Sequence, residues 1–352
     1  MSNDFHYGVA VGINRYPEFE DLHNAKRDAE QFSIWLKDSD GGDLPEHNVK
    51  LVVVPDSEMP DGTLRESATP THANVLDEIK AIIRAVEAHV EDHPEDWMHT
   101  RLYLFVSGHG IAPEPGDAAL LTANAGPDDL GYNIPSRELI RYLSDSRTFK
   151  EIVIFADCCR DRLQESPPPW IPWAKRKNDR GEISMFFGCA ADSGEQAFEP
   201  TAIGATAPDD YRGYFTTALL EGLNGAAAAE NESEIDSNNL ARFLREKVIE
   251  LTQGTSISQK ANTETDPSLP ILFRTAVHPS FQIQLVFSTG FQGTAVLRNG
   301  NLKEIDRKDV ADGIWIVHLP YGGYLVEDES GLASFDGGGF FKVLGGAKTI
   351  HV

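Results

Sequence analysis

Cysteine is scarce in this chain, since only Cys158, Cys159 and Cys189 occur among its 352 residues. Two of the three are adjacent, and adjacent cysteines rarely pair with each other, so no disulfide framework is visible. Paired Cys-x-x-Cys spacings and an EF-hand loop are missing too, which argues against structural zinc and a recognisable calcium site. We therefore expect no metal, no cofactor and a reducing compartment such as the cytoplasm.

The sequence also lacks a long apolar run and an excess of basic residues. No stretch of about 18 apolar residues is present to span a bilayer, and the amino terminus, Met1-Ser-Asn-Asp-Phe-His-Tyr7, lacks the regions of a signal peptide. Lys and Arg number 31 against 55 Asp and Glu, for a net charge of −24. This charge repels nucleic-acid phosphates and anionic membranes, so we expect neither as a partner, whereas basic substrates would be attracted.

Apolar runs and helical patterns alternate through the first two-thirds of the chain, which is typical of a parallel sheet flanked by helices. Strands are expected at Tyr7–Ile13, Val49–Val54, Arg101–Val106, Glu151–Ala156, Met185–Ala190 and Leu269–Phe273. Amphipathic helix patterns fall around Ala29, Ile79, Ile140, Leu219 and Leu244. The order of the strands in the sheet cannot be deduced from these patterns.

Two of the expected strands end in residues that carry chemistry. The first runs into Leu104-Phe-Val-Ser-Gly-His-Gly110, and the second runs into Ile152-Val-Ile-Phe-Ala-Asp-Cys-Cys-Arg160. Because parallel strands end at the same edge of a sheet, His109 and Cys159 are expected to meet there. An imidazole beside a thiol supplies a base and lowers the thiol pKa, which is the arrangement of a cysteine peptidase.

Together the two motifs resemble those of the caspase-like superfamily, which includes caspases, metacaspases and paracaspases. The spacing of about 50 residues between His and Cys is that of caspases, while Asp157-Cys-Cys-Arg160 looks more like the Asp-x-Cys-Arg of paracaspases and metacaspases. The match makes Cys159 the nucleophile and Cys158 the variable residue. It spans roughly residues 5 to 274 and implies one six-stranded, mainly parallel sheet with helices on both faces.

The expected reaction begins with attack of the Cys159 thiolate on a peptide carbonyl. His109 acts first as base and then as acid, and it activates the water that hydrolyses the acyl-enzyme. The resemblance assigns the stabilisation of the oxyanion to the backbone N–H groups of Cys159 and Gly110. The sequence does not reveal a third member of the triad.

Specificity is expected to come from acidic residues beside the nucleophile. Asp157 precedes Cys159 by two residues, and the resemblance of Leu22-His-Asn-Ala-Lys-Arg-Asp-Ala29 to the first helix of metacaspases and paracaspases points to Asp28. Two carboxylates in one pocket would bind a guanidinium and reject an acid, which predicts cleavage after Arg, then Lys. If Arg27 faced the pocket instead, acidic substrates would be favoured. Asp192 and Glu195 are further candidates for lining the cleft.

The segment 161–182 contains Pro167, Pro168, Pro169 and Pro172 and a basic cluster. Successive prolines preclude a regular helix or a central strand, so an ordered surface loop is one interpretation. The other is a self-cleavage site, because the resemblance implies that this connection separates two subunits and that cutting it activates a latent precursor.

The pattern changes near residue 275, and we expect a peptidase domain over 1–275 and a small all-β, sandwich-like domain over 276–352. Short strands are expected at Phe281–Phe287, Gly293–Leu297, Ile314–Leu319, Tyr324–Glu327, Phe340–Leu344 and Lys348–Val352. No catalytic pattern occurs in this domain, so packing or binding of a regulatory protein is its expected role.

The function expected from these features is a cytoplasmic cysteine endopeptidase acting on protein substrates with exposed Arg or Lys. Immune defence and programmed cell death enter only by analogy with the family. Two alternatives stay open: a non-catalytic caspase-like scaffold, and a transferase or deacylase acting on small acyl substrates.

Overall fold

The computed structural model describes residues 3–54, 58–113, 117–158, 161–162, 180–191, 213–228, 233–253, 259–275, 281–288, 291–311, 313–320, 322–331, 333, 335–343 and 348–352. The chain divides into two compact units. The first comprises Met1–Leu220 and Leu244–Ile271, and the second comprises Glu221–Phe243 and Leu272–Val352. The domain boundary expected near residue 275 stays a prediction.

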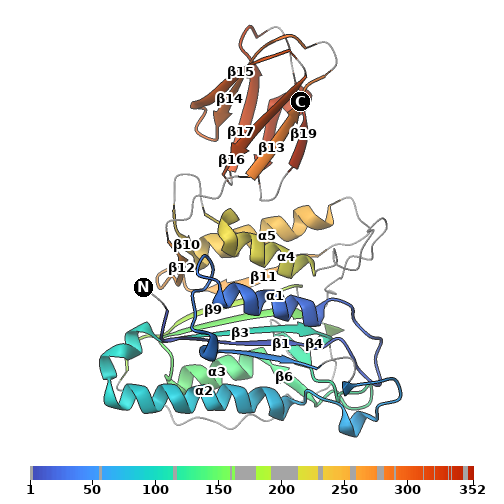
Figure 1. Ribbon diagram of the computed structural model, residues 1–352, viewed down its shortest axis with the longest axis vertical. Helices are drawn as coiled ribbons and strands as arrows, with labels where there is room; N and C mark the ends of the chain where they lie inside the picture. Colours follow the sequence, from blue (N-terminus) through green and yellow to red (C-terminus); the bar gives the residue numbers. More distant parts are fainter. Residues whose placement is uncertain are drawn as a thin grey trace. The chain divides into compact units, whose positions relative to one another are not determined.

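The first unit is built on a six-stranded sheet with the order β11-β9-β7-β3-β1-β2 (Figure 1). Five of its strands are parallel, and β11 pairs antiparallel with β9 at the edge. The strands are β1 His6–Gly12, β2 Val49–Val53, β3 Arg101–Gly108, β7 Glu151–Cys158, β9 Ser184–Cys189 and β11 Asn262–Thr265. The expected mainly parallel α/β architecture is confirmed.

The sixth strand is not the one that the sequence predicts. β11 is the polar segment Asn262–Thr265, whereas the expected strand at Leu269–Phe273 contributes Leu272–Arg274 (β12), which pairs with Ile235–Asp236 (β10) in a separate two-stranded sheet. An edge strand buries less of its surface than a central one, and the burial of β11 is intermediate throughout. It therefore needs no apolar run.

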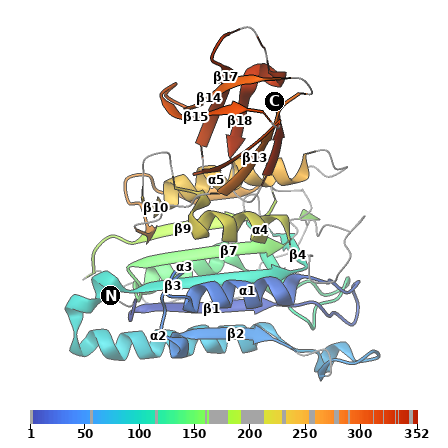
Figure 2. The same cartoon turned by 45° about the horizontal axis from the view of Figure 1, so that its top comes forward.

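Helices cover both faces of the sheet (Figure 2). Alternate residues of the central strands point to opposite faces. On one face, Phe32 of α1 (Ala25–Lys37) packs on Phe105 and Phe155, with ring centroids 4.9 and 5.6 Å apart. α4 (Tyr214–Glu221) lies on the same face. The other face carries α2 (His72–Asp92) and α3 (Ser136–Ser146), whose buried side chains join the main hydrophobic core.

The remaining helical elements are α5 and a set of short turns. α5 spans Ser237–Thr252. The turns are Glu46–Asn48, Arg65–Ser67, Pro94–His99, Gly222–Ala226 and Asp336–Gly339. α2 begins with a capping box, in which the side chain of Thr71 accepts from the Asn74 backbone N–H and Asn74 Oδ1 accepts from the Thr71 N–H.

A small second sheet with the order β6-β5-β4-β8 lies at the carboxyl ends of β3 and β7. Its strands are β4 Gly110–Ala112, β5 Ala119–Leu121, β6 Asn133–Pro135 and β8 Asp161–Arg162. Sequence patterns did not predict it, because strands of two or three residues are too short to show a period. β4 follows His109 directly, so this sheet holds the backbone beyond the histidine.

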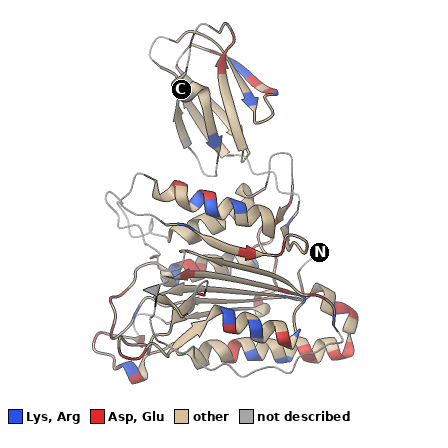
Figure 3. Cartoon of the chain, turned by 180° about the vertical axis from the view of Figure 1, so that it is seen from behind, with Lys and Arg blue, Asp and Glu red and all other residues tan. Residues whose placement is uncertain are grey.

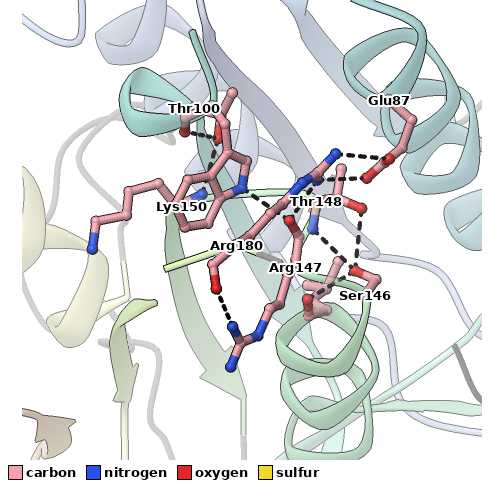
Figure 4. A network of polar contacts seen from close by, with 9 residues as sticks. Glu87, Thr100, Ser146, Arg147, Thr148, Lys150 and Arg180 are labelled. Carbon is pink, nitrogen blue, oxygen red and sulfur yellow. Dashed lines mark hydrogen bonds and ion pairs between the residues drawn. The ribbon is translucent and has the colours of Figure 1, made fainter. Parts of the chain in front are cut away.

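The segment that leads into β9 is anchored at the other end of the sheet (Figure 4). The guanidinium of Arg180 donates to both carboxylate oxygens of Glu87 on α2, at 3.0 and 3.1 Å, and to the carbonyl oxygen of Arg147, at 2.6 Å. Arg147 in turn donates to the carbonyl oxygens of Arg180 and Gly181. Lys150 Nζ donates to the carbonyl oxygen of Glu182. Most of the expected loop 161–182, including its prolines, lies outside the described residues.

The second unit contains the expected β sandwich. A three-stranded sheet, β16-β13-β19, and a four-stranded sheet, β15-β14-β17-β18, share one apolar core that includes Leu285, Trp315 and Tyr324. The strands are β13 Phe281–Val286, β14 Gly293–Asn299, β15 Glu304–Val310, β16 Ile314–Leu319, β17 Gly322–Asp328, β18 Phe340–Val343 and β19 Lys348–His351. β15 was not predicted, because its sequence is mostly charged and largely exposed.

Charged side chains lie along the helices and on the carboxy-terminal strands, whereas the central strands of the six-stranded sheet carry few (Figure 3). This distribution is that of solvated helix surfaces around an apolar sheet. Within the described ranges, no helix combines the length and hydropathy that a bilayer crossing requires.

Candidate active site

The two strands that carry the motifs are adjacent and end together. β3 pairs in parallel with β7, and the register places Ser107 beside Asp157 and Gly108 beside Cys158. β4 and β8 then continue the pairing, with Ile111 beside Asp161. Strand pairing therefore holds the chain on both sides of His109. The paired residues are those just before and just after positions 159–160.

Cys159, the expected nucleophile, lies outside the described residues. Cys158 and Cys189 are both buried. A buried thiol in apolar surroundings is protected from reaction, which agrees with the assignment of Cys158 as the variable position of the motif.

His109 is held through its backbone and its ring. Its N–H donates to Tyr16 Oη at 3.1 Å, its carbonyl oxygen accepts from the Leu121 N–H at 2.8 Å, and its Nε2 lies 2.7 Å from the carbonyl oxygen of Glu20. A carbonyl oxygen only accepts, so Nε2 carries the proton in this contact. The neutral imidazole then keeps its lone pair on Nδ1, which is the atom available to take a proton from a nucleophile.

Two aromatic rings pack on the imidazole. The ring centroids of Tyr16 and Phe19 lie 4.8 and 5.6 Å from that of His109. Tyr16 is buried and also donates to the carbonyl oxygen of Leu121. A Cβ at Gly108 would lie 2.5 Å from Tyr16 Oη, so the Ser-Gly-His sequence lets this hydroxyl reach the histidine backbone.

Gly110 is the first residue of β4 and is buried, directly after His109 as the resemblance requires. Asp192 and Glu195 lie outside the described residues. The structure describes the chain again from Asp161, after the nucleophile motif. Here Asp161 and Arg162 form β8 beside β4.

Asp28 and Asp157 converge on the start of α4. Asp28 Oδ2 accepts from the Gly213 N–H at 3.3 Å, and Asp157 Oδ2 accepts from the N–H and the hydroxyl of Thr216 at 3.1 and 2.6 Å. The two carboxylates come from different elements, α1 and β7. Both are nearly inaccessible to solvent, with exposed fractions of 2% and 8%.

Gly213 allows this approach, because a Cβ on it would lie 2.4 Å from Asp157 Oδ2 and 3.2 Å from Asp28 Oδ2. The N-terminus of α4 also carries a partial positive charge that favours nearby carboxylates. Two buried carboxylates at one place form a site for a cation, provided that the ligand makes the remaining hydrogen bonds.

Several residues of this site were missed by reasoning from the sequence. Tyr16, the Glu20 carbonyl, Gly213 and Thr216 all lie in segments without a catalytic motif. A backbone carbonyl leaves no signal in a sequence, and Gly213 and Thr216 lie more than 50 residues from Asp157. The glycine before the apolar stripe of α4 was the one available hint.

Among the residues that the structure describes, no three His, Cys, Asp or Glu side chains are grouped so that they could hold a metal ion.

No protein-family profile matches the chain. A curated relative, a probable protease from a Desulfuromonadales bacterium, is 28% identical over 262 residues, which is 69% of this chain. The chain spans only 29% of the length of that relative.

Solved structures with a similar fold have low sequence identity to this chain. A protein from Geobacter sulfurreducens is 14% identical, with 75% of this chain and 96% of that one covered and a TM-score of 0.43. Caspase-1 from Spodoptera frugiperda is 14% identical, with 74% and 88% covered and a TM-score of 0.41. The Arg-specific cysteine proteinase gingipain R is 12% identical, with 93% and 65% covered and a TM-score of 0.33. At these TM-scores the likeness identifies neither a mechanism nor a substrate.

The sheet has the architecture that the motifs led us to expect. It contains six strands, five of them parallel, and helices cover both of its faces. The sheet that the resemblance implies is present, and the sequence of the chain is similar to that of a probable protease.

Proposed function

We propose that this chain is a cysteine endopeptidase that cleaves proteins after Arg, and less readily after Lys. The observation that carries the proposal is the convergence of Asp28 and Asp157 on Gly213, with β7 ending beside the strand that leads into His109. A cation-binding pocket beside an oriented imidazole is what hydrolysis after a basic residue requires.

Cys159 is the proposed nucleophile. Its neighbours in the sequence, Cys158 and Asp161, pair with Gly108 and Ile111, and His109 lies between those two partners. This register supports a meeting of the Cys159 thiol with the His109 imidazole. The imidazole, held at Nε2 by Glu20, takes the thiol proton on Nδ1 and leaves a thiolate–imidazolium pair.

In the proposed reaction the thiolate attacks the carbonyl carbon of the substrate. The S–C bond forms, the C–N bond breaks, and the proton on Nδ1 moves to the leaving nitrogen. Water then attacks the acyl-enzyme and gives its proton to Nδ1, which restores the thiol when the carboxylate product leaves. The N–H groups of Gly110 and Cys159 are the proposed oxyanion donors.

Specificity in this proposal comes from charge. A guanidinium between Asp28 and Asp157 makes charge-assisted hydrogen bonds that a neutral side chain does not make, while an acidic side chain meets two buried negative charges. The alternative in which Arg27 selects acidic substrates is less favoured, because the Asp28 carboxylate accepts from the Gly213 N–H at the start of α4. Asp192 is kept as a proposed contributor to the pocket.

The proposal includes a latent precursor that is activated by cleavage between residues 160 and 182, and protein substrates in the cytoplasm. It also includes a regulatory protein that binds the carboxy-terminal β unit. A role in defence rests on analogy alone.

The rival function is a non-catalytic scaffold in which the pocket binds partners without turnover. The hydrogen bond from Nε2 to Glu20 argues for catalysis, because it orients the imidazole for proton transfer. A transferase or deacylase acting on small acyl groups is the other alternative, and turnover of Arg against Asp reporter peptides separates it from proteolysis.

The test is a peptide-library cleavage profile of the wild type beside Cys159→Ala, with Cys158→Ala as the matched control. We expect cleavage after Arg and Lys that Cys159→Ala abolishes and Cys158→Ala retains. Cleavage that survives Cys159→Ala, or a preference for Asp, would overturn the proposal.

A further inference from the structure

A polar cavity lies beside the aromatic residues that pack on His109. It has a volume of about 290 Å³, and its lining includes Arg15, Tyr16, Phe19, Asp21, Asp61 and Thr63. Tyr16 and Phe19 are the two rings that pack on the His109 imidazole. The cavity and the imidazole therefore share two walls.

The position of this cavity follows from the order of the strands. Asp157 and the nucleophile motif lie at the end of β7, and His109 follows β3. The residues that line the cavity follow β1 and β2, which are the next strands in the sheet order β7-β3-β1-β2. In the order of the strands, His109 thus falls between Asp157 and the residues that line the cavity.

Proton transfer decides which part of a substrate reaches this cavity. In the proposed reaction His109 protonates the amine that leaves when the C–N bond breaks, so the residue that follows the cleaved bond must lie against the imidazole. The carboxylate pair takes the residue before the bond. The following residue then extends past the imidazole, toward the cavity that has Tyr16 and Phe19 in its lining.

The volume fits one side chain. Pockets for drug-sized molecules begin at about 300 Å³, so this cavity is suited to a single amino-acid side chain rather than to a larger ligand. Its walls supply aromatic surface from Tyr16 and Phe19 and polar groups from the loop 59–63.

The charge of the cavity is net negative. Arg15 forms ion pairs with Asp21 and with Asp61, so two carboxylates face one guanidinium. The side chain of Asp61 is 97% exposed and that of Asp21 is 45% exposed. Exposed ion pairs are weak, and an incoming cation can therefore take one of these carboxylates as a partner.

We propose that this cavity receives the side chain of the residue directly after the cleaved bond, and that it favours basic or neutral polar residues there over acidic ones. The inference rests on the proposed peptidase function and adds a second determinant of its substrate class. Asp61 is the specificity-determining residue that it names.

The experiment compares three peptides that share Arg before the cleaved bond and carry Lys, Ser or Glu after it. The quantity measured is the ratio of kcat/KM for the Lys and Glu peptides. We expect this ratio to exceed one in the wild type, to fall about two- to fivefold in Asp61→Asn, and to invert in Asp61→Lys. A fourth substrate, an Arg amide of a fluorogenic amine, has no side chain after the bond and should respond equally in all variants.

Asp77→Asn is the matched control, because Asp77 is a 73% exposed aspartate on α2 that does not line the cavity. An unchanged Lys to Glu ratio in both Asp61 variants would overturn the inference, and so would an equal change in Asp77→Asn, which would show general steering by charge. If the wild type cleaves the fluorogenic Arg amide while the ratio is insensitive to Asp61, the inference alone fails. If the wild type cleaves none of the four substrates, the proposed function fails and the inference fails with it.

Discussion

The Nε2 atom of His109 lies 2.7 Å from the carbonyl oxygen of Glu20, and the backbone N–H of the same histidine donates to the hydroxyl of Tyr16. The first contact selects the tautomer with its proton on Nε2, and the second holds the turn that carries the ring. Substitution of Glu20 leaves its backbone carbonyl in place, whereas substitution of Tyr16 by Phe removes the hydroxyl. The orientation of the imidazole is therefore testable through Tyr16.

Tyr16→Phe removes the acceptor of the His109 N–H and the donor to the Leu121 carbonyl. We expect kcat to fall by up to about thirtyfold, since two buried hydrogen bonds of about 1 kcal/mol each are lost and 1.36 kcal/mol is tenfold in rate. KM should change less than kcat, because the lost hydroxyl bonds to the backbone of His109 and Leu121 while the aromatic ring is kept. Steady-state kinetics measures both, with Tyr142→Phe on α3 as the control; a change confined to KM would contradict this role.

Asp157→Asn keeps an oxygen that accepts from Thr216 but removes the charge. A hydrogen bond to a charged group contributes about 1.5–3 kcal/mol, so kcat/KM for Arg peptides should fall roughly tenfold to a hundredfold. Thr216→Val is the matched control, because it removes the hydroxyl and leaves the carboxylate. We expect it to lower stability and to retain the preference for Arg over a neutral residue. Equal losses of preference in the two variants would assign Asp157 to packing alone.

Stability should depend on pH through His6. Burial, with help from Arg101 and His99, lowers the pKa of His6 from 6.5 to about 2. The unfolded chain therefore binds a proton below pH 6.5 that the folded chain does not bind, so the stabilisation is complete above pH 6.5 and is lost as the pH falls toward 2. From pH 7.5 to pH 5 this one group should cost about 2 kcal/mol.

Urea unfolding at the two pH values measures this loss. His6→Phe keeps a ring against Tyr103, whose centroid lies 6.2 Å from that of His6, and it should flatten the pH dependence. The exposed His47→Gln should leave the dependence unchanged. An unaltered slope in His6→Phe would show that other groups cause the acid sensitivity.

Cleavage within 163–179 should leave the two fragments associated. β7 and β9 pair from Glu151 with Ser184 to Ala156 with Cys189, and Arg180 bonds to Glu87 and Arg147 (Figure 4). We expect purified wild type to show two bands on a denaturing gel but one peak in gel filtration. Cys159→Ala should stay intact under both conditions. Fragments that separate without denaturant would contradict the anchoring seen here.

The fold was largely predictable because the central strands are apolar runs with clear bounds. The continuous apolar runs of β3 and β7 and the helical stripes of α1 to α3 follow directly from burial. β11 and β15 were not predictable, since edge and exposed strands carry polar residues such as Asn262 and Lys308. Tertiary pairing, and not local pattern, makes them strands.

The candidate site was predictable where a residue type reports its chemistry. His109, Asp28 and Asp157 were all named from motifs, and the structure places Asp28 and Asp157 together at the start of α4. The partners that orient them were not predictable, because the Glu20 carbonyl and the Gly213 N–H are backbone groups. Every residue carries such groups, so they leave no signal in the sequence. Their selection depends on the packing of α1 and α4 against the sheet.

The central claim is that one imidazole activates one thiol beside a pocket for Arg, and an Arg chloromethyl ketone tests it most directly. Peptide mapping by mass spectrometry should locate the adduct on Cys159 and leave Cys158 and Cys189 unmodified, with free Arg slowing the reaction. His109→Ala should slow it at least a hundredfold, because general acid–base assistance contributes about 10²–10⁴-fold. An adduct on Cys158 or Cys189 alone, or a rate on Cys159 that His109→Ala does not change, would contradict the account.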